Sequence, residues 1–384
     1  MKIGFVMDDL SVHSNGTSVT AERYARELRR QGHNVRIVGF GAHGSEAFPL
    51  AEHHIPVVSA VSDAEGFHFA TPDDAVFDRA LGDVDIVHLF LPFEVERFAL
   101  EWARRRGKPV SAAFHLMPES ITYGADIGAA PPVCDAIYAL WRDRLYNRVR
   151  HVHTISPLMK QLLESHGYTA HIHVISNGIP GCFTADDRAA FDDGLFHIVT
   201  VGRLAHEKNQ RVIVDAVARS AHRDHIQLHL CGEGPLRHHL EKLGAKLPHP
   251  PQFEYLGTDD LVKLEQRCPV YVHASLVDSE AISVVEALAC GCAPVIGQAP
   301  LSAPSEFALC EQSLFPATDP DALARRIDWW IEHPDERARW RTRYLAEAEN
   351  LRIERCVRQF VAMEEQAIAD DGPLASSNSR ATRP

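Results

Sequence analysis

The chain has 384 residues, of which 45% are hydrophobic and 24% are charged, a balance that is typical of a folded globular protein and excludes a disordered or fibrous one. At about 150 residues per domain, this length predicts two or three domains. The net charge of −13 argues against broad nucleic-acid binding, because contacts with phosphates need a positive surface.

The amino terminus is unlike a signal peptide, because Asp8 and Asp9 directly follow the first apolar run. The longest stretch without Asp, Glu, Lys or Arg, residues 165–185, contains three His, one Asn and one Pro and is too polar to cross a bilayer. We therefore expect a cytoplasmic protein whose membrane contact is at most peripheral, on the inner face.

In the first half, short apolar runs alternate with stretches of helical composition, such as residues 21–31, which end at Gly32. Strands are expected at residues 3–7, 35–40, 85–90, 109–114 and 152–155. This alternation favours a parallel sheet with helices on both faces.

Residues 176–181 (Ser-Asn-Gly-Ile-Pro-Gly) interrupt this alternation and are typical of a linker. Strands are expected again at residues 196–201, 226–231, 253–256, 270–273 and 293–296. The fold class is therefore α/β, with two doubly wound (Rossmann-like) parallel-sheet domains facing a cleft, where ligands bind at the carboxyl ends of strands. The expected parts are a first domain (1–180), a second domain (181–345), a helix packing back on the first domain (346–368) and a disordered tail (369–384).

The cysteines and histidines offer no strong metal signal. None of the eight cysteines forms a C-x-x-C pair, and we interpret them as buried free thiols in a reducing compartment. His151 alternates with His153, and His171 with His173, but neither pair has a third ligand at suitable spacing. We interpret these residues as ordinary strand histidines and predict no metal site.

Glycines follow several expected strands, where they let the backbone approach a ligand. Gly16 precedes the first helix, where a plain loop is an equally good interpretation. Gly202 follows the first strand of the second domain, and Arg203 and Lys208 come after it. The planar guanidinium of Arg203 and the ammonium of Lys208 can together neutralise a diphosphate. The sequence Gly232-Glu233-Gly234 follows the next strand.

The most informative segment contains Asp278 in a loop and Glu286 about two turns into the following helix. Both carboxylates could accept hydrogen bonds from the hydroxyls of a sugar and a ribose. Acids at a helix N-terminus also favour the helix dipole, which would explain Asp278 and Glu280 but not Glu286 among Val and Ala.

These segments together resemble the retaining GT-B glycosyltransferases of family 4, over roughly residues 1–366. That family carries Glu-x7-Glu, whose first acid contacts the donor sugar and whose second contacts the ribose; Asp278 and Glu286 stand there, with Asp for the first Glu. The resemblance implies that Arg203 and Lys208 contact the diphosphate and that His115 lies near the sugar. The implied donor site comprises Gly16, Gly202, Arg203, Lys208, Gly232, Glu233, Gly234, Asp278, Glu280, Ala281, Ile282, Ser283 and Glu286.

The resemblance assigns catalysis to His115, Arg203, Lys208 and Asp278, and acceptor contacts to His115 and Glu119. Residues 114–122, 174–179, 305–309 and 313–315 are similar to bacterial diacylglycerol glucosyltransferases. The resemblance also implies that the first domain (1–180) binds the acceptor and that the second domain (181–345) binds the nucleotide-sugar. The implied reaction moves a hexose, with UDP-glucose as the first choice of donor, to a hydroxyl of a lipid or glycan. The resemblance also implies retention of configuration, no tightly bound cofactor and no strict need for a metal.

Two other functions stay open: a nucleotide-sugar 2-epimerase with two similar domains, and a non-catalytic nucleotide-sugar binding module.

Membrane contact is a separate question. Residues 104–108 and 142–150 are rich in arginine, and the second segment is accompanied by Trp141, directly before it, and by Tyr146 within it. A basic helix with aromatics can lie on anionic lipid, and a solvated helix that packs inward is the alternative.

Overall fold

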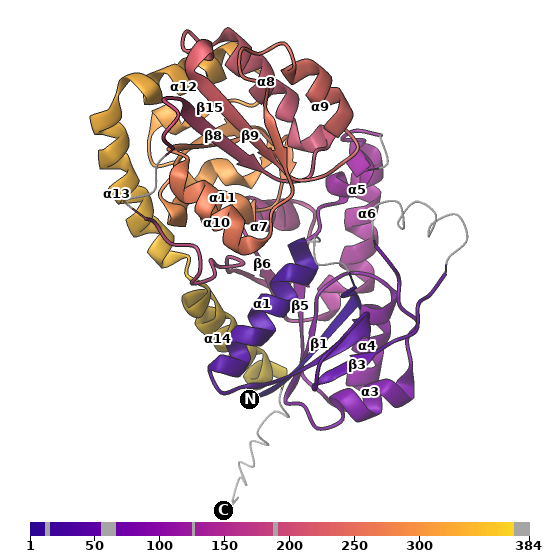
Figure 1. Ribbon diagram of the computed structural model, residues 1–384. Helices are drawn as coiled ribbons and strands as arrows, with labels where there is room; N and C mark the ends of the chain where they lie inside the picture. The colour runs from indigo at the N-terminus through magenta and orange to yellow at the C-terminus, as the bar shows by residue number, and fades with distance from the viewer. Residues whose placement is uncertain (12–15, 55–66, 125–126, 187–190, 372–384) are drawn as a thin grey trace, which may run out of the picture.

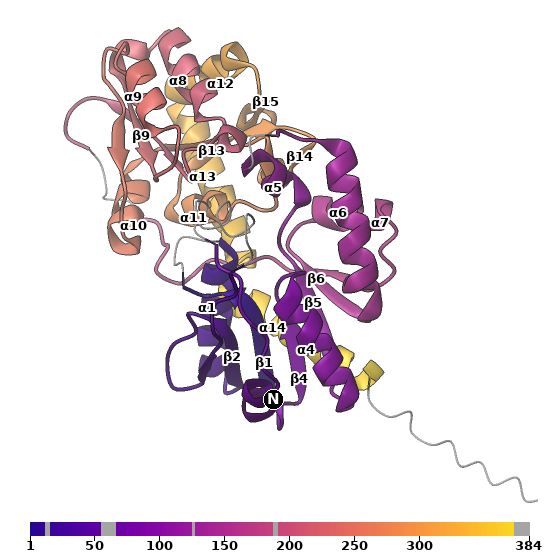
Figure 2. The same cartoon turned by 90° about the vertical axis from the view of Figure 1, so that its right-hand side faces the viewer.

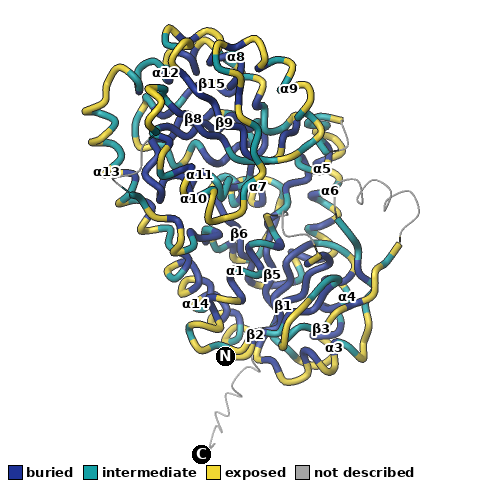
Figure 3. Tube along the Cα trace, viewed as in Figure 1, coloured by how far each residue is buried: buried dark blue, intermediate teal, exposed yellow. Residues whose placement is uncertain are grey.

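The computed structural model describes residues 1–11, 16–54, 67–124, 127–186 and 191–371 and consists of two α/β domains (Figure 1). Each domain is built on its own parallel sheet, and the strands of both sheets are the most buried parts of the chain (Figure 3). The predicted fold class, two doubly wound parallel-sheet domains, is confirmed.

The first domain has a seven-stranded sheet with the order β3-β2-β1-β4-β5-β6-β7. The change of direction at β1 is the point at which doubly wound sheets bind ligands. The strands are β1 (Lys2–Asp9), β2 (Asn34–Phe40), β3 (Ala47–Pro49), β4 (Ile86–Leu89), β5 (Val110–Phe114), β6 (His151–Thr154) and β7 (His171–Val174). The helices are α1 (Gly16–Arg30), α3 (Asp74–Leu81), α4 (Glu94–Arg105), α5 (Pro118–Gly124), α6 (Pro131–Arg144) and α7 (Pro157–Ser165).

The second domain has a six-stranded sheet with the order β10-β9-β8-β11-β13-β15, and a small separate sheet of β12 and β14. The strands are β8 (Phe196–Val201), β9 (Ile226–Cys231), β10 (Gln252–Glu254), β11 (Val270–His273), β12 (Val277–Asp278), β13 (Ala293–Gln298), β14 (Leu301–Ser302) and β15 (Leu314–Pro316). The helices are α8 (Gln210–Arg219), α9 (Arg237–Gly244), α10 (Thr258–Arg267), α11 (Ile282–Cys290), α12 (Pro320–Glu332) and α13 (Pro334–Asn350).

The last helix, α14 (Ile353–Asp371), leaves the second domain and packs on the first, beside α1 (Figure 1). Its Glu364 is fully buried and accepts hydrogen bonds from the Ser111 hydroxyl of β5 at 2.7 and 2.8 Å. Where α14 begins, Gly178 adopts a φ of +79°, and a Cβ there would lie 2.7 Å from the Cα of Ile353. The glycine of the predicted linker therefore permits the chain crossing between the domains.

Helix α14 continues to Asp371, so residues 369–371 of the predicted tail are helical, and residues 372–384 lie outside the described residues. All eight cysteines are free, as expected. Six are buried, but Cys182 is exposed and Cys310 is half-buried, so the interpretation as buried thiols was wrong for these two. No helix in the described ranges is long and apolar enough to cross a membrane.

Two buried acids meet beneath the carboxyl end of β1. Asp8 is fully buried, its backbone N–H donates to Glu96 Oε1 at 3.2 Å, and its Oδ1 accepts from the backbone N–H of Ala70 at 2.9 Å. Burial raises the pKa of Asp8 to about 6, and it also raises the pKa of Glu96. The folded state therefore holds protons here that the unfolded chain releases near pH 4.

Because the pKa of Asp8 is raised on folding, its contribution to stability is greatest at low pH and is lost as the pH rises through about 6. We predict that Asp8→Asn stabilises the protein at pH 8 relative to wild type, by on the order of 1–3 kcal/mol, and brings little gain at pH 4.5. Thermal unfolding at both pH values measures this difference. The exposed control Asp224→Asn should show no such pH dependence, and an equal effect of Asp8→Asn at both pH values would contradict the prediction.

Candidate functional site

The segments of the predicted site meet where the two domains touch. Helix α5 follows β5 of the first domain and lies against β12 and the short helix His206–Lys208 of the second (Figure 2). Val277 and Leu301 of the second domain pack into the apolar core of the first. The carboxyl ends of strands from both sheets therefore border this interface.

Lys208, Asp278 and His273 form a charged cluster on the second domain. Lys208 Nζ lies 2.5 Å from Asp278 Oδ2, and His273 Nε2 lies 3.2 Å from the same oxygen. Burial works to raise the pKa of Asp278, but the charge of Lys208 and the approach of His273 outweigh it and hold that pKa well below its ordinary value. Asp278 is therefore ionised over the whole physiological pH range.

The turn that presents Lys208 is fixed by Asn209, which adopts a φ of +54°. The Asn209 amide donates to the carbonyl of Ala317 at 2.8 Å, and the carbonyl of Glu207 accepts from Leu276 N–H at 2.7 Å. Asn tolerates this left-handed conformation better than most residues. The ammonium of Lys208 is thus held against Asp278 by its own turn as well as by charge.

Glu286, the second acid of the predicted motif, is paired across the domain interface. It is buried on α11, and its Oε1 lies 2.7 Å from Nη1 of Arg23, which belongs to α1 of the first domain. Burial raises the pKa of Glu286, and the guanidinium of Arg23 offsets this only in part. Nothing in the sequence pointed to Arg23, which lies 263 positions away in an ordinary amphipathic helix.

Glu280 contacts the linker between the domains. Its carboxylate accepts hydrogen bonds from the Asn177 side chain at 2.6 Å and from the Asn177 backbone N–H at 3.1 Å. Burial raises the pKa of Glu280 to about 7, against the opposing effect of these hydrogen bonds. The carboxylate that we expected among the donor contacts is therefore engaged by the linker.

The start of α11 is shaped by the other residues of the predicted motif. Ala281 adopts a φ of +57°, and its N–H donates to Asp278 Oδ1 at 3.0 Å, which closes the turn before Ile282 begins the helix. The Ser283 hydroxyl accepts from Tyr271 at 2.8 Å and donates to the Val201 carbonyl at 3.2 Å. Asp278 is thus bonded to the beginning of the helix that carries Glu286.

The glycine loops after β8 and β9 pack against each other. A Cβ on Gly232 would lie 2.1 Å from the carbonyl oxygen of Gly202, and a Cβ on Gly234 would lie 2.4 Å from that of Leu204. These glycines are therefore required for packing, whatever else they contact. Between them, the side chain of Glu233 is ion-paired with Arg237. Arg203 is exposed, and its backbone carbonyl accepts from Gln210 at 2.8 Å.

On the first domain, His115 follows β5 and is buried, with its ring edge-on to His153 at 5.0 Å. Its Nε2 has no hydrogen-bond partner within the described residues. Burial, and then the neighbouring His153 and His88, hold the pKa of His115 well below its usual value, so the ring is neutral. Its orphaned nitrogen can bond to a sugar hydroxyl.

The two remaining predicted residues lie on the first domain as well. Glu119 is buried on α5, where its Oε2 accepts from the Tyr138 hydroxyl at 3.1 Å. Gly16 is the exposed first residue of α1, with no atom within 4 Å of a Cβ built there, while Asn15 of the same predicted loop lies outside the described residues. Arg23, Asn177 and His273 are the site residues that sequence reasoning missed.

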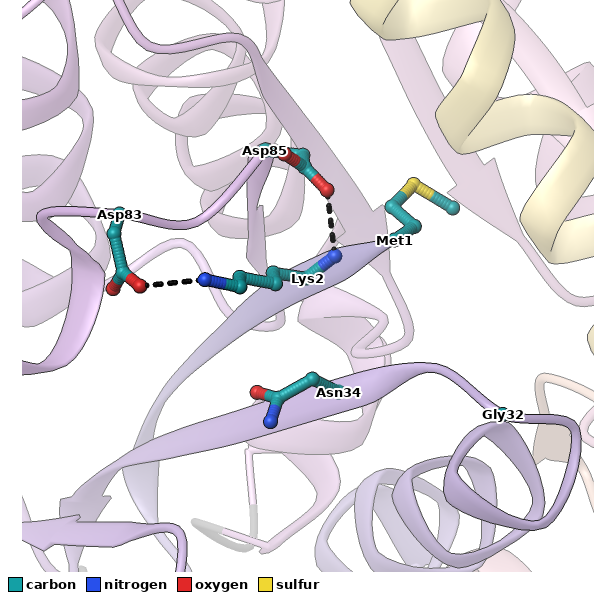
Figure 4. Close-up of a pocket in the computed structure, with 6 residues that line it drawn as sticks. All are labelled: Met1, Lys2, Gly32, Asn34, Asp83 and Asp85. Atoms are coloured by element: carbon teal, nitrogen blue, oxygen red, sulfur yellow. Dashed lines mark hydrogen bonds and ion pairs between the residues drawn. The ribbon is translucent and has the colours of Figure 1, made fainter.

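A pocket at the opposite end of the first sheet is separate from this site. Met1, Lys2, Gly32, Asn34, Asp83 and Asp85 line it (Figure 4). Lys2 donates from its ammonium to Asp83 at 2.8 Å and from its backbone N–H to Asp85 at 2.7 Å. Because these residues lie at the amino ends of the strands and are paired with one another, this pocket is not part of the candidate site.

Comparison with known families identifies both domains. Residues 14–180 match the family Glycosyltransferase Family 4, and residues 184–344 match the family Glycosyl transferases group 1. A search of curated proteins finds no match. Both families are transferases, which does not favour the epimerase alternative.

Three solved structures are similar to the chain. The catalytic domain of cholesterol-alpha-glucosyltransferase from Helicobacter pylori is 41% identical over 40% of this chain and 98% of its own, with a TM-score of 0.40. Sucrose-phosphate synthase from Thermosynechococcus elongatus is 16% identical over 96% and 99%, with a TM-score of 0.78. HepE of Anabaena, in complex with UDP-glucose, is 15% identical over 95% and 100%, with a TM-score of 0.75.

The buried ion pair predicts strong energetic coupling between Lys208 and Asp278. Lys208→Met leaves the Asp278 carboxylate buried with reduced compensation, so we expect a loss of about 3 kcal/mol of unfolding free energy. The double variant with Asp278→Asn should recover part of this loss, with a coupling of about 1–3 kcal/mol in a double-mutant cycle.

Denaturant unfolding of the four proteins measures the coupling. Lys263 and Asp260 provide a matched exposed pair, 2.8 Å apart, for which the same cycle should give less than about 1 kcal/mol. A double variant whose loss of stability equals the sum of the losses of Lys208→Met and Asp278→Asn would show that the pair is not coupled.

Proposed function

The chain belongs to the GT-B glycosyltransferases, and on this premise we propose that it transfers a hexose from a nucleotide-diphosphate sugar to a lipid hydroxyl with retention of configuration. The observation that carries the proposal is that the Lys208–Asp278 pair and Glu286, which is paired with Arg23 of α1, both lie at the domain interface. His115 comes three residues before α5, the helix that contacts β12 of the second domain. UDP-glucose is the proposed donor, since the Anabaena protein of the same fold is found with it.

In this proposal the bond from the sugar C1 to the diphosphate oxygen breaks, and a new bond forms from C1 to the acceptor oxygen. Negative charge develops on the departing diphosphate, where Arg203 and Lys208 stabilise it. The acceptor proton passes to an oxygen of that phosphate, so no protein carboxylate has to act as base. A metal at the donor site is not required, because the two cations offer the compensating charge.

Donor binding would exchange partners within the cluster. The ammonium of Lys208 lies 2.5 Å from Asp278. Because it has three N–H groups, it can contact both this carboxylate and a phosphate oxygen. Asp278 would then orient the sugar hydroxyls together with His115. Glu286 would receive the ribose hydroxyls in place of, or beside, the guanidinium of Arg23, 2.7 Å away.

A lipid acceptor is supported by apolar side chains exposed around α5 and α6. Val133 and Leu140 lie about two turns apart on the outer face of α6, and Ile121 and Ile127 lie on α5 and just after it. The inward face of α6 carries Tyr138, the partner of Glu119. An apolar face this near the proposed acceptor residues suits the surface of a membrane that holds the acceptor.

The arginines of the two basic segments contribute less to this surface than the sequence suggested. Arg142 pairs with Asp143 at 2.7 Å, Arg105 with Asp74 at 3.1 Å, Arg106 with Asp78 at 2.5 Å and Arg148 with Glu101. Their charges are largely balanced within the chain. We therefore assign the membrane contact chiefly to the apolar side chains of α5 and α6.

The proposed site predicts large losses of transfer activity. Lys208→Ala and Glu286→Ala should each lower kcat/KM by about 100-fold or more, because each removes a charged contact to the donor. A panel of nucleotide-sugars, offered with extracted lipids and with soluble glycans and followed by mass spectrometry, identifies donor and acceptor and supplies the assay. Lys263→Ala, on the exposed pair, should retain activity within about twofold.

Undiminished transfer by Lys208→Ala or Glu286→Ala would refute the site. Conversion of UDP-GlcNAc in the absence of any acceptor would instead support the epimerase alternative. Donor binding without turnover on every acceptor would support a binding module.

The apolar surface predicts binding to vesicles. Wild type should sediment with vesicles that contain anionic phospholipid, and Leu140→Glu or Ile127→Glu should weaken this binding about tenfold, since each replaces an exposed apolar side chain that would enter the lipid. Tyr255→Glu is the matched control, because Tyr255 is an exposed apolar residue on the second domain. The absence of binding at low salt, or an equal loss for Tyr255→Glu, would contradict membrane contact through α5 and α6.

A further inference from the structure

Three histidine rings meet at the amino ends of β6 and β7, the end of the first sheet remote from the domain interface. One ring nitrogen from each of His151, His171 and His173 lies within 4.8 Å of the other two. In the part of the chain that the structure describes, this is the one group of three or more His, Cys, Asp or Glu with such spacing. The sequence showed two separate pairs, and the third ligand becomes visible only in the fold.

The strand register brings the rings together. His151 is paired with His171 in the parallel ladder of β6 and β7, and His173 is two residues further along the same strand face. The rings of His171 and His173 stack at 4.3 Å, and His151 Nδ1 lies 2.9 Å from His173 Nε2. His151 is buried while His171 is exposed, so the group is anchored on one side and reachable from solvent on the other.

A carboxylate orients the buried ring. Asp370, in the last turn of α14, lies with its Oδ2 2.9 Å from His151 Nε2. With the proton of His151 on Nε2 and donated to Asp370, the lone pair of Nδ1 points toward His173. Metal-binding histidines commonly donate their second ring N–H to a carboxylate in this way, which fixes the tautomer and makes the ring a better ligand.

The second domain offers an informative contrast. His197 Nδ1 lies 2.9 Å from His229 Nε2, a pair with the same spacing as His151 and His173. There, however, both outer nitrogens face carboxylates, Asp193 at 3.0 Å and Glu254 at 3.1 Å, and Phe191 stacks on His197 at 3.4 Å. The ring nitrogens of His197 and His229 are therefore all engaged by neighbouring side chains, while the pair of His151 and His173 has a third imidazole, that of His171, beside it.

We propose that His151, His171 and His173 bind one divalent transition-metal ion such as Zn²⁺, with Asp370 as the orienting partner of His151. Three imidazoles suit such ions, and the exposed side leaves a fourth position for water. The ion would take no part in sugar transfer, because the candidate donor site lies at the opposite ends of the strands. Through the contact of His151 with Asp370, the ion would hold the end of α14 against the sheet. The ion pair of Arg150 with Asp371, at 3.4 Å, is a second contact at the same place.

The test uses the full chain without a histidine tag, stripped with a chelator. Titration with Co²⁺, followed by the visible absorption of the bound ion, and calorimetry with Zn²⁺ should both show one equivalent bound. His171→Ala and His173→Ala should weaken binding at least tenfold, and Asp370→Asn by about tenfold. Zn²⁺ should also raise the Tm of wild type, because it binds the folded state, and should not raise that of the double variant His171→Ala/His173→Ala.

His238→Ala is the control, since His238 is 77% exposed on α9 and lies near Glu241 in an ordinary helical pair. It should bind like wild type. Circular dichroism establishes that each variant is folded before its affinity is compared. Failure of wild type to bind one equivalent, or unchanged binding by the folded double variant, would overturn the proposal.

Discussion

Three carboxylates are buried where the two domains meet, and the packing of this interface depends on a partner for each. A buried carboxylate without compensation is costly enough to take up a proton or to force the structure open. Asp278 is paired with Lys208 within its own domain, Glu280 with Asn177 of the linker, and Glu286 with Arg23 of the first domain. Two of the three pairings therefore tie the second domain to other parts of the chain, the linker and α1 of the first domain.

These pairings differ in a way that matters for a ligand. Asp278 is ionised because a cation lies against it, whereas burial raises the pKa of Glu280 to about 7 and the hydrogen bonds from the uncharged Asn177 oppose this only in part. Glu280 therefore suits a structural contact that is not exchanged during turnover. Lys208 and Arg23 each offer more than one N–H donor, so each can contact a charged donor and its carboxylate at the same time.

Regular alternation of apolar runs made the domains predictable from the sequence. Strands β8, β9 and β11 begin and end where the pattern placed them, because a buried parallel strand needs a continuous apolar run. The strands β3, β12, β14 and β15 were missed, since two or three residues are too few to show a period, and the four-residue β7 was missed as well. Lys208 and Asp278 stood out as polar residues after apolar strands, but their direct contact depends on the turn at Asn209.

Contacts between distant segments mark the limit of such reasoning. Arg23 belongs to a helix whose composition resembles any amphipathic surface helix, and only the approach of the second domain makes it a partner of Glu286. The same holds for Asp370, whose contact with His151 forms because α14 returns to the first sheet. Since α14 begins against Gly178 and also contacts Ser111 through Glu364, one helix links the crossing point of the domains to the first sheet. The orientation of the two domains is consequently determined as much by this returning helix as by the residues of the interface itself.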